Sequence, residues 1–123
     1  MSKKVKILVV DRSPLVAPRI TDLLSDYKDS ILIGEARNAE EALTLFHFID
    51  FDFVLLDLPF KNATALLMQM KEKFPAKVIM FTNHSAPAYR NVCMNLGADY
   101  FIDKSSEFKG LEEVLMKDLL IAA

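Results

Sequence analysis

The feature of this sequence that most restricts its fold is an alternation of two kinds of segment. Short runs rich in β-branched and apolar residues recur five times, and an amphipathic stretch with helical spacing follows each run. The runs cover residues 5–10, 31–36, 53–56, 78–81 and 100–102. Strands that alternate with helices form a parallel sheet, and continuous apolar runs are typical of strands buried on both faces. The pattern therefore predicts an α/β domain with helices on both faces of a five-stranded parallel sheet.

Residues at the segment boundaries support this division. Ser13-Pro14 is typical of an N-cap followed by proline at the first helical position, and Asn38 is a second predicted N-cap. Pro75 is expected to end the third helix, and Gly97 is expected just beyond the end of the fourth. Pro18 lies inside the first helical stretch and is expected to distort or shift its start.

The composition excludes several classes of function. A length of 123 residues fits one domain, and a net charge of −2 gives none of the basic surface that nucleic-acid binding needs. The single cysteine, Cys93, excludes an internal disulfide and a thiolate zinc cluster, and three glycines are too few for a phosphate-binding glycine loop. No signal peptide and no bilayer-spanning apolar run is visible. We therefore expect a cytoplasmic domain with no membrane segment and no direct nucleic-acid contact.

Polar residues collect where the predicted strands end. Asp11 ends the first strand, Asp57 the third and Thr82 the fourth, and Lys104 follows the fifth. Ligands of open parallel sheets bind beyond the carboxyl ends of the strands, so these groups should converge. Each alone is more commonly a cap or turn residue. Together, two carboxylates, a hydroxyl and an ammonium are the groups that can form an acyl phosphate beside a divalent cation and hold it.

These residues and their spacing resemble the receiver domains of response regulators in bacterial two-component signalling. The similar segments are Lys6–Asp11, Val54–Leu58, Thr82 and Gly97–Lys104, and successive polar residues are 46, 25 and 22 positions apart. The segment Asp103–Phe108 is further similar to small, chemotaxis-type receivers that stand alone. The resemblance implies a flavodoxin-like (βα)5 doubly wound sheet with strand order 2-1-3-4-5. It also implies a single receiver domain over residues 1–123, without an output domain.

The resemblance further implies a role for each site residue. Asp57 would be the phosphoacceptor, Asp11 and Asp57 would hold Mg²⁺, and Lys104 would bind the phosphoryl group. Thr82 would be the switch hydroxyl and Phe101 the switch aromatic. The implied partners are a sensor histidine kinase or a histidine phosphotransfer protein, and a downstream protein. Such a domain is not an enzyme beyond its own phosphorylation and dephosphorylation, and it would be a monomer or a weak homodimer.

The sequence departs from the family pattern at Arg12, where receivers carry a second metal-binding acid. At about 5 Å and an effective dielectric near 20, each pair of unit charges interacts by roughly 3 kcal/mol, so this change should weaken Mg²⁺ binding. Arg12 could pair with Asp57 and partly replace the charge of the metal, or it could point outward. Lys61 and Ala65 replace a usual proline and glycine, and Ser105 replaces a usual proline, which leaves the isomer of the preceding peptide bond open.

Three functions remain open from the sequence. The first is a switch driven by phosphorylation of Asp57, and the second is a pseudo-receiver that binds a partner without phosphorylation, which Arg12 favours. The third, a flavin- or nucleotide-binding protein of the same topology, is weak because residues 11–14 contain no glycine for a phosphate-binding loop. His84, two residues after Thr82, is expected to be a surface residue of a loop rather than a catalytic base.

Overall fold

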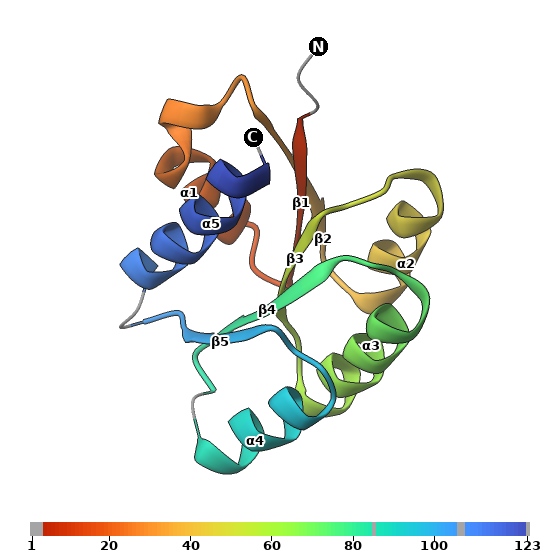
Figure 1. Cartoon of the computed structure of the whole chain (residues 1–123). Helices are drawn as coiled ribbons and strands as arrows, with labels where there is room; N and C mark the ends of the chain where they lie inside the picture. Colours follow the sequence, from red (N-terminus) through yellow and green to blue (C-terminus); the bar gives the residue numbers. More distant parts are fainter. Residues whose placement is uncertain (1–3, 85, 106–107, 123) are drawn as a thin grey trace.

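The predicted parallel sheet is present in the computed structural model, which describes residues 4–84, 86–105 and 108–122 (Figure 1). The strands are β1 (Val5–Asp11), β2 (Ile31–Ala36), β3 (Phe53–Asp57), β4 (Lys77–Thr82) and β5 (Tyr100–Asp103). Within the described residues they form one sheet in the order β2-β1-β3-β4-β5, and every neighbouring pair is parallel. The flavodoxin-like fold expected from the sequence is therefore confirmed.

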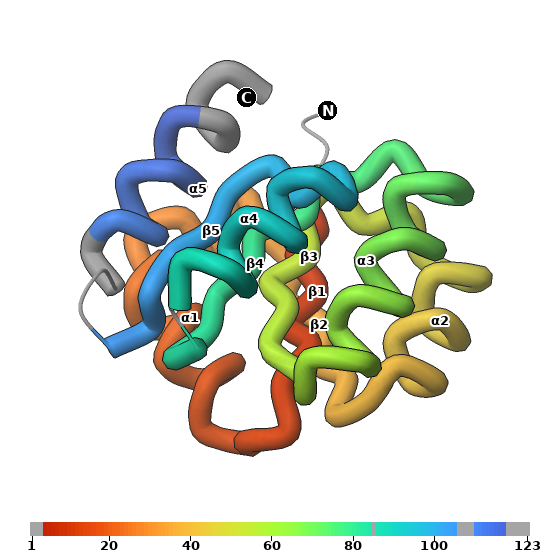
Figure 2. The backbone as a smooth tube through the Cα atoms, turned by 90° about the horizontal axis from the view of Figure 1, so that it is seen from below, coloured from red at the N-terminus to blue at the C-terminus, as the bar shows by residue number. Residues whose placement is uncertain are grey.

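The helices cover both faces of this sheet. They are α1 (Val16–Leu23), α2 (Ala39–Phe48), α3 (Phe60–Lys73), α4 (Pro87–Asn95) and α5 (Phe108–Ala122), with a short 3-10 helix at Ser25–Tyr27. Helices α1 and α5 lie on one face, and α2, α3 and α4 lie on the other (Figures 1 and 2). Among the described residues, no helix combines the length and the apolar character needed to cross a bilayer.

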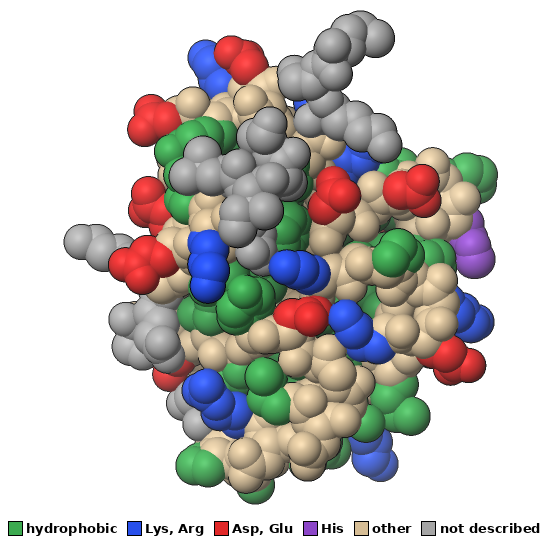
Figure 3. Space-filling view, viewed as in Figure 1, with side chains coloured by type: hydrophobic (Ala, Val, Ile, Leu, Met, Phe, Trp, Pro, Cys, Tyr) green, Lys and Arg blue, Asp and Glu red, His purple; other side chains and the backbone are tan. Residues whose placement is uncertain are grey.

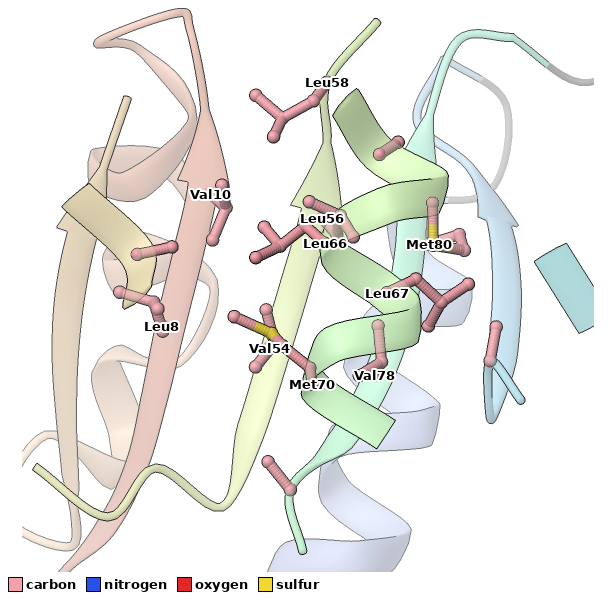
Figure 4. Packing of buried hydrophobic residues seen from close by; sticks show 14 of the residues in the cluster. Leu8, Val10, Val54, Leu56, Leu58, Leu66, Leu67, Met70, Val78 and Met80 are labelled. Atoms are coloured by element: carbon pink, nitrogen blue, oxygen red, sulfur yellow. The ribbon is translucent and has the colours of Figure 1, made fainter. Parts of the chain in front are cut away.

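The core has two parts because neighbouring side chains of a strand point to opposite faces of the sheet. Leu8 and Val10 of β1 pack toward α2 and α3, whereas Ile7 and Val9 pack toward α1 and α5. Figure 4 shows the first part, in which α3 packs against the strands through Leu66, Leu67 and Met70, opposite Val54, Leu56, Val78 and Met80. Burial on both faces explains why the strands read as continuous apolar runs.

Three of the predicted helix boundaries are confirmed. The Asn38 side chain accepts a hydrogen bond from the backbone N–H of Glu41 at 2.9 Å and caps α2. Helix α3 ends at Lys73, ahead of Pro75. Gly97 follows α4 with a φ of 105°, and the backbone around it closes the helix end as a Schellman motif.

The start of the first helix differs from the prediction. Helix α1 begins at Val16 rather than after Ser13, and no side chain caps it. Pro18 is the third residue of α1, where a backbone N–H has no intrahelical partner, so proline removes no hydrogen bond of the helix there. Helix α4 buries a narrow face, because Tyr89 and Cys93 are buried whereas Val92, beside Cys93 in sequence, is 37% exposed.

Candidate functional site

The carboxyl edge of the sheet brings the four predicted site residues together. Asp11 and Asp57 are partners in the pairing of β1 with β3, and Thr82 is the partner of Asp103 in the pairing of β4 with β5. Lys104 follows β5 directly, and its backbone N–H donates a hydrogen bond to the Thr82 carbonyl oxygen at 3.0 Å. Strand register therefore places these residues, as the sequence predicted.

One ammonium group joins the two carboxylates. Lys104 Nζ donates hydrogen bonds to Asp11 Oδ2 at 2.6 Å and to Asp57 Oδ2 at 2.5 Å. The three side chains are 13%, 8% and 18% exposed, so water screens these charges only partly. Hydrogen bonds between two charged groups are about twice as strong as those between neutral ones. The Lys104 side chain therefore holds both carboxylates in place.

The environment of Lys104 has opposing effects on its pKa. Burial disfavours the ammonium and by itself would lower the pKa. The hydrogen bonds to Asp11 and Asp57 and the charges of these carboxylates act in the other direction and outweigh burial, so the pKa of Lys104 is raised. The ammonium form is therefore present at every physiological pH.

A pocket opens at this edge of the sheet. It is lined by Asp11, Arg12, Ser13, Asp57, Leu58, Pro59, Phe60 and His84. Arg12 is exposed, and it makes no hydrogen bond or ion pair with any residue that the structure describes. Asp57 is paired with Lys104 instead, so the hypothesis of an Arg12–Asp57 pair is wrong for this state. Arg12 points outward but stays at the rim of the pocket.

The two predicted switch residues are buried behind the pocket. The Thr82 side chain is fully buried, and its Oγ1 accepts a hydrogen bond from the backbone N–H of His84 at 3.1 Å. Phe101 is 6% exposed and meets the ring of Tyr89 edge-on, with 5.7 Å between the ring centroids. Tyr89 was not predicted as a site residue, because its place on the apolar stripe of α4 indicates only packing.

Comparison with known proteins decides the family. The sequence model of the response regulator receiver domain matches residues 7–116. The chain belongs to the response regulator receiver domain family. Receivers are the signalling domains of two-component systems, in which they interact with histidine kinases and with effector partners.

Similar sequences occur within longer proteins. The chain is 32% identical over 121 residues to a protein-glutamate methylesterase/protein-glutamine glutaminase of Bacillus subtilis (strain 168), a match covering 95% of this chain and 34% of that protein. It is 30% identical over 114 residues to the nitrate/nitrite response regulator protein NarL of Escherichia coli (strain K12), covering 89% of this chain and 52% of that protein. The receiver thus spans about a third to a half of the length of these relatives.

Solved structures share the fold. A response regulator from Thermotoga maritima superimposes with a TM-score of 0.85 at 23% identity, over 95% of this chain and 98% of that chain. The BeF3-activated receiver domain of DrrB superimposes with a TM-score of 0.78 at 20% identity, over 96% of this chain and 98% of that chain. At these identities the superpositions show the fold alone.

Receiver domains generally bind Mg²⁺ at their phosphorylation site. Magnesium needs one or two carboxylates together with phosphate oxygens and water, and Asp11 and Asp57 supply that minimum here. No group of three or more His, Cys, Asp or Glu side chains suited to a metal occurs in the described part of the chain. Both carboxylates already bind the Lys104 ammonium, and Arg12 adds a second cation. The residues therefore fit Mg²⁺ with few protein ligands and no net negative charge.

The remaining departures from the family pattern have local consequences. Lys61 and Ala65 lie inside α3, which begins at Phe60, only three residues after Asp57. Ala65 lies in the interior of α3, where alanine is a better helix former than glycine, whereas Lys61 lies in the first turn, where proline would also be tolerated. Among the described residues no peptide bond is cis, so the Lys104–Ser105 bond is trans.

Proposed function

We propose that this receiver is a phosphoacceptor of a phosphorelay and that Asp57 takes the phosphoryl group. The observation that supports the proposal best is the hydrogen bonding of this carboxylate. Its Oδ2 is held by Lys104, whereas its Oδ1 accepts no hydrogen bond from the residues that the structure describes. One oxygen is thus fixed by a cation, and the other is available at the pocket for attack on phosphorus.

The reaction is a phosphoryl transfer from a histidine of the donor protein. Asp57 Oδ1 attacks phosphorus, the new P–O bond forms as the P–N bond breaks, and the leaving imidazole nitrogen keeps the electron pair and takes a proton from water. Lys104 donates a hydrogen bond to a phosphoryl oxygen, which stabilises charge that exists only after transfer has begun. Mg²⁺, when bound by Asp11 and Asp57, supplies further positive charge to the phosphoryl oxygens.

The output is a change of conformation that a partner protein reads. Thr82 is close to the site through its backbone contact with Lys104, so its hydroxyl is the group that turns toward a phosphoryl oxygen, and Phe101 adjusts with it. The implied partners are a histidine kinase or phosphotransfer protein and a downstream protein. A stand-alone role stays a prediction, because the relatives carry this region within longer proteins. The size of the native protein tests it.

Arg12 supports a second candidate, a pseudo-receiver that binds its partner without phosphorylation. Its positive charge at the pocket rim opposes Mg²⁺, which receivers use for phosphorylation. The presence of all three phosphorylation residues argues against this alternative, because a protein that binds its partner only through its outer surface needs neither Asp57 nor Thr82 nor Lys104.

A small phosphodonor separates the two candidates. Incubation of the protein with acetyl phosphate, with and without millimolar Mg²⁺, should add the mass of one phosphoryl group, measured by intact mass spectrometry. Asp57→Asn is the matched control: it keeps the shape of the side chain, and we expect it to remove the gain completely. No gain in the wild type at any Mg²⁺ concentration would favour the pseudo-receiver, and a gain that persists in Asp57→Asn would place the acceptor elsewhere.

A further inference from the structure

Three aromatic rings connect β5 with the rim of the phosphorylation pocket. Tyr89 of α4 meets the Phe101 ring edge-on at 5.7 Å and the Phe60 ring at 5.3 Å between centroids. Phe60 is the first residue of α3 and lines the pocket beside Asp57. Tyr89 therefore contacts both the aromatic residue of the switch and a residue of the pocket rim, so neither can move without affecting its ring.

The hydroxyl of Tyr89 is buried and has no hydrogen bond to an oxygen or nitrogen atom of the described residues. Tyr89 is 8% exposed, and its hydroxyl is the buried side-chain polar atom that lacks a partner among the described residues. Burial, the charge of Cys93 and a weak hydrogen bond with its side chain, and the Asp57 charge raise the pKa of Tyr89 above its usual range, so the phenol keeps its proton. A thiol sulfur is a weak acceptor and does not replace an oxygen partner.

A buried hydroxyl without a partner destabilises the state in which it occurs. A second state that supplies a partner is favoured by the same free energy, since only a difference between two states shifts their populations. We propose that Tyr89 is a positioning residue of the switch, and that its hydroxyl gains an oxygen acceptor in the phosphorylated state. The inference rests on the proposed phosphoacceptor function of Asp57.

Substitution of Tyr89 by phenylalanine tests this role, because it removes the hydroxyl and keeps the ring contacts. The thermal midpoint of the free protein should rise or stay unchanged, because an unpaired buried group is lost. The apparent affinity for fluoroberyllate with Mg²⁺, taken from the rise in thermal midpoint with ligand concentration, should fall by about five- to a hundredfold. In the wild type, but not in Tyr89→Phe, fluoroberyllate should shift the tyrosine absorption band, as a new phenol hydrogen bond does.

Tyr27→Phe is the matched control. It removes the same hydroxyl from a partly buried tyrosine that packs in the other part of the core, with α1 and α5, and should leave fluoroberyllate affinity unchanged. Equal affinities of wild type and Tyr89→Phe overturn the inference and leave the phosphoacceptor proposal intact. A lower thermal midpoint of free Tyr89→Phe identifies a packing role and also overturns it. Absence of any fluoroberyllate effect on the wild type overturns the phosphoacceptor function and the inference together.

Discussion

Lys104 bridges two carboxylates that would otherwise repel each other where the strands end. Its ammonium lies within hydrogen-bond distance of both, and all three side chains are mostly buried. Removal of one member of such a cluster leaves charge without a partner in a poorly solvated place. The residue that is expected to bind the phosphoryl group therefore also stabilises the unphosphorylated domain.

Lys104→Met should lower the free energy of unfolding by about 1–3 kcal/mol at neutral pH, since it removes two hydrogen bonds to charged groups. Because folding raises the pKa of Lys104, its contribution is fully present below the unfolded pKa, about 10.4, and is lost as the pH rises through the folded pKa. The difference between wild type and variant in urea unfolding should therefore be constant between about pH 6 and 10 and shrink above it. A difference that shrinks between pH 6 and 8 would show that another group is responsible.

We expect Arg12 to weaken the metal affinity of the site. Arg12→Asp replaces a cation at the pocket rim with a third carboxylate, and we expect the Mg²⁺ dissociation constant to fall by about tenfold or more. Titration calorimetry measures the change. Lys28→Asp makes the same charge reversal at an exposed position before β2, at the end of the sheet where the strands begin. It should leave the Mg²⁺ affinity unchanged. Equal affinities for wild type and Arg12→Asp would show that Arg12 does not act on the metal.

At the scale of the elements, the connection from α4 to β5 is fixed by contacts with neighbouring segments. Lys71 of α3 forms an ion pair with Asp99 at 2.9 Å, and the same Asp99 oxygen accepts a hydrogen bond from the backbone N–H of Val78 at 2.8 Å. Gly97, two residues before Asp99, adopts a positive φ, and a Cβ atom placed there would lie 3.3 Å from Lys71 Cγ. Both the backbone and the space available thus favour glycine.

Gly97→Ala should lower the free energy of unfolding by about 1–3 kcal/mol, because alanine is strained at this φ and crowds Lys71. Urea denaturation followed by circular dichroism measures the change. Gly110→Ala, the same substitution at the third residue of α5, where φ is not positive, is the control and is expected not to lower stability. An unchanged stability of Gly97→Ala would contradict the importance of this turn.

Local sequence signals predicted most elements but not the start of α1. Asn38 and Gly97 act within their own helix ends, so their roles could be recognised without tertiary structure. Near Ser13, side-chain hydrogen bonds compete with the expected helix start. Asp11 Oδ1 accepts a hydrogen bond from the Ser13 backbone N–H at 2.8 Å, and Ser13 Oγ accepts one from the Leu15 N–H at 3.2 Å. These side-chain turns occupy the residues after β1 and delay the helix. The side chain of Asp11, a residue of the site, therefore prevents Ser13 from acting as the predicted N-cap of α1.

At the scale of the whole molecule, strand order was predictable through the family resemblance, and the partners within the site were not. Lys104 is 93 residues from Asp11 and 47 from Asp57, so the sequence could place them at one edge but could not choose between Lys104 and Arg12 as the partner of Asp57. The unpaired hydroxyl of Tyr89 likewise depends on how α3, α4 and β5 pack together. Figure 3 shows acidic and basic side chains interspersed, in keeping with the net charge of −2.

The contacts of Lys104 also determine where the chain tolerates changes in length. This one residue, placed after β5, is bonded to the last residues of β1, β3 and β4. Adding or deleting a single residue within any of these strands would shift its end by about 3.3 Å and break a bond at the site. The turns where the strands begin, such as residues 28–30 before β2, form no hydrogen bond with this cluster among the described residues. Fusion tags, inserted loops and new chain termini are therefore best introduced there.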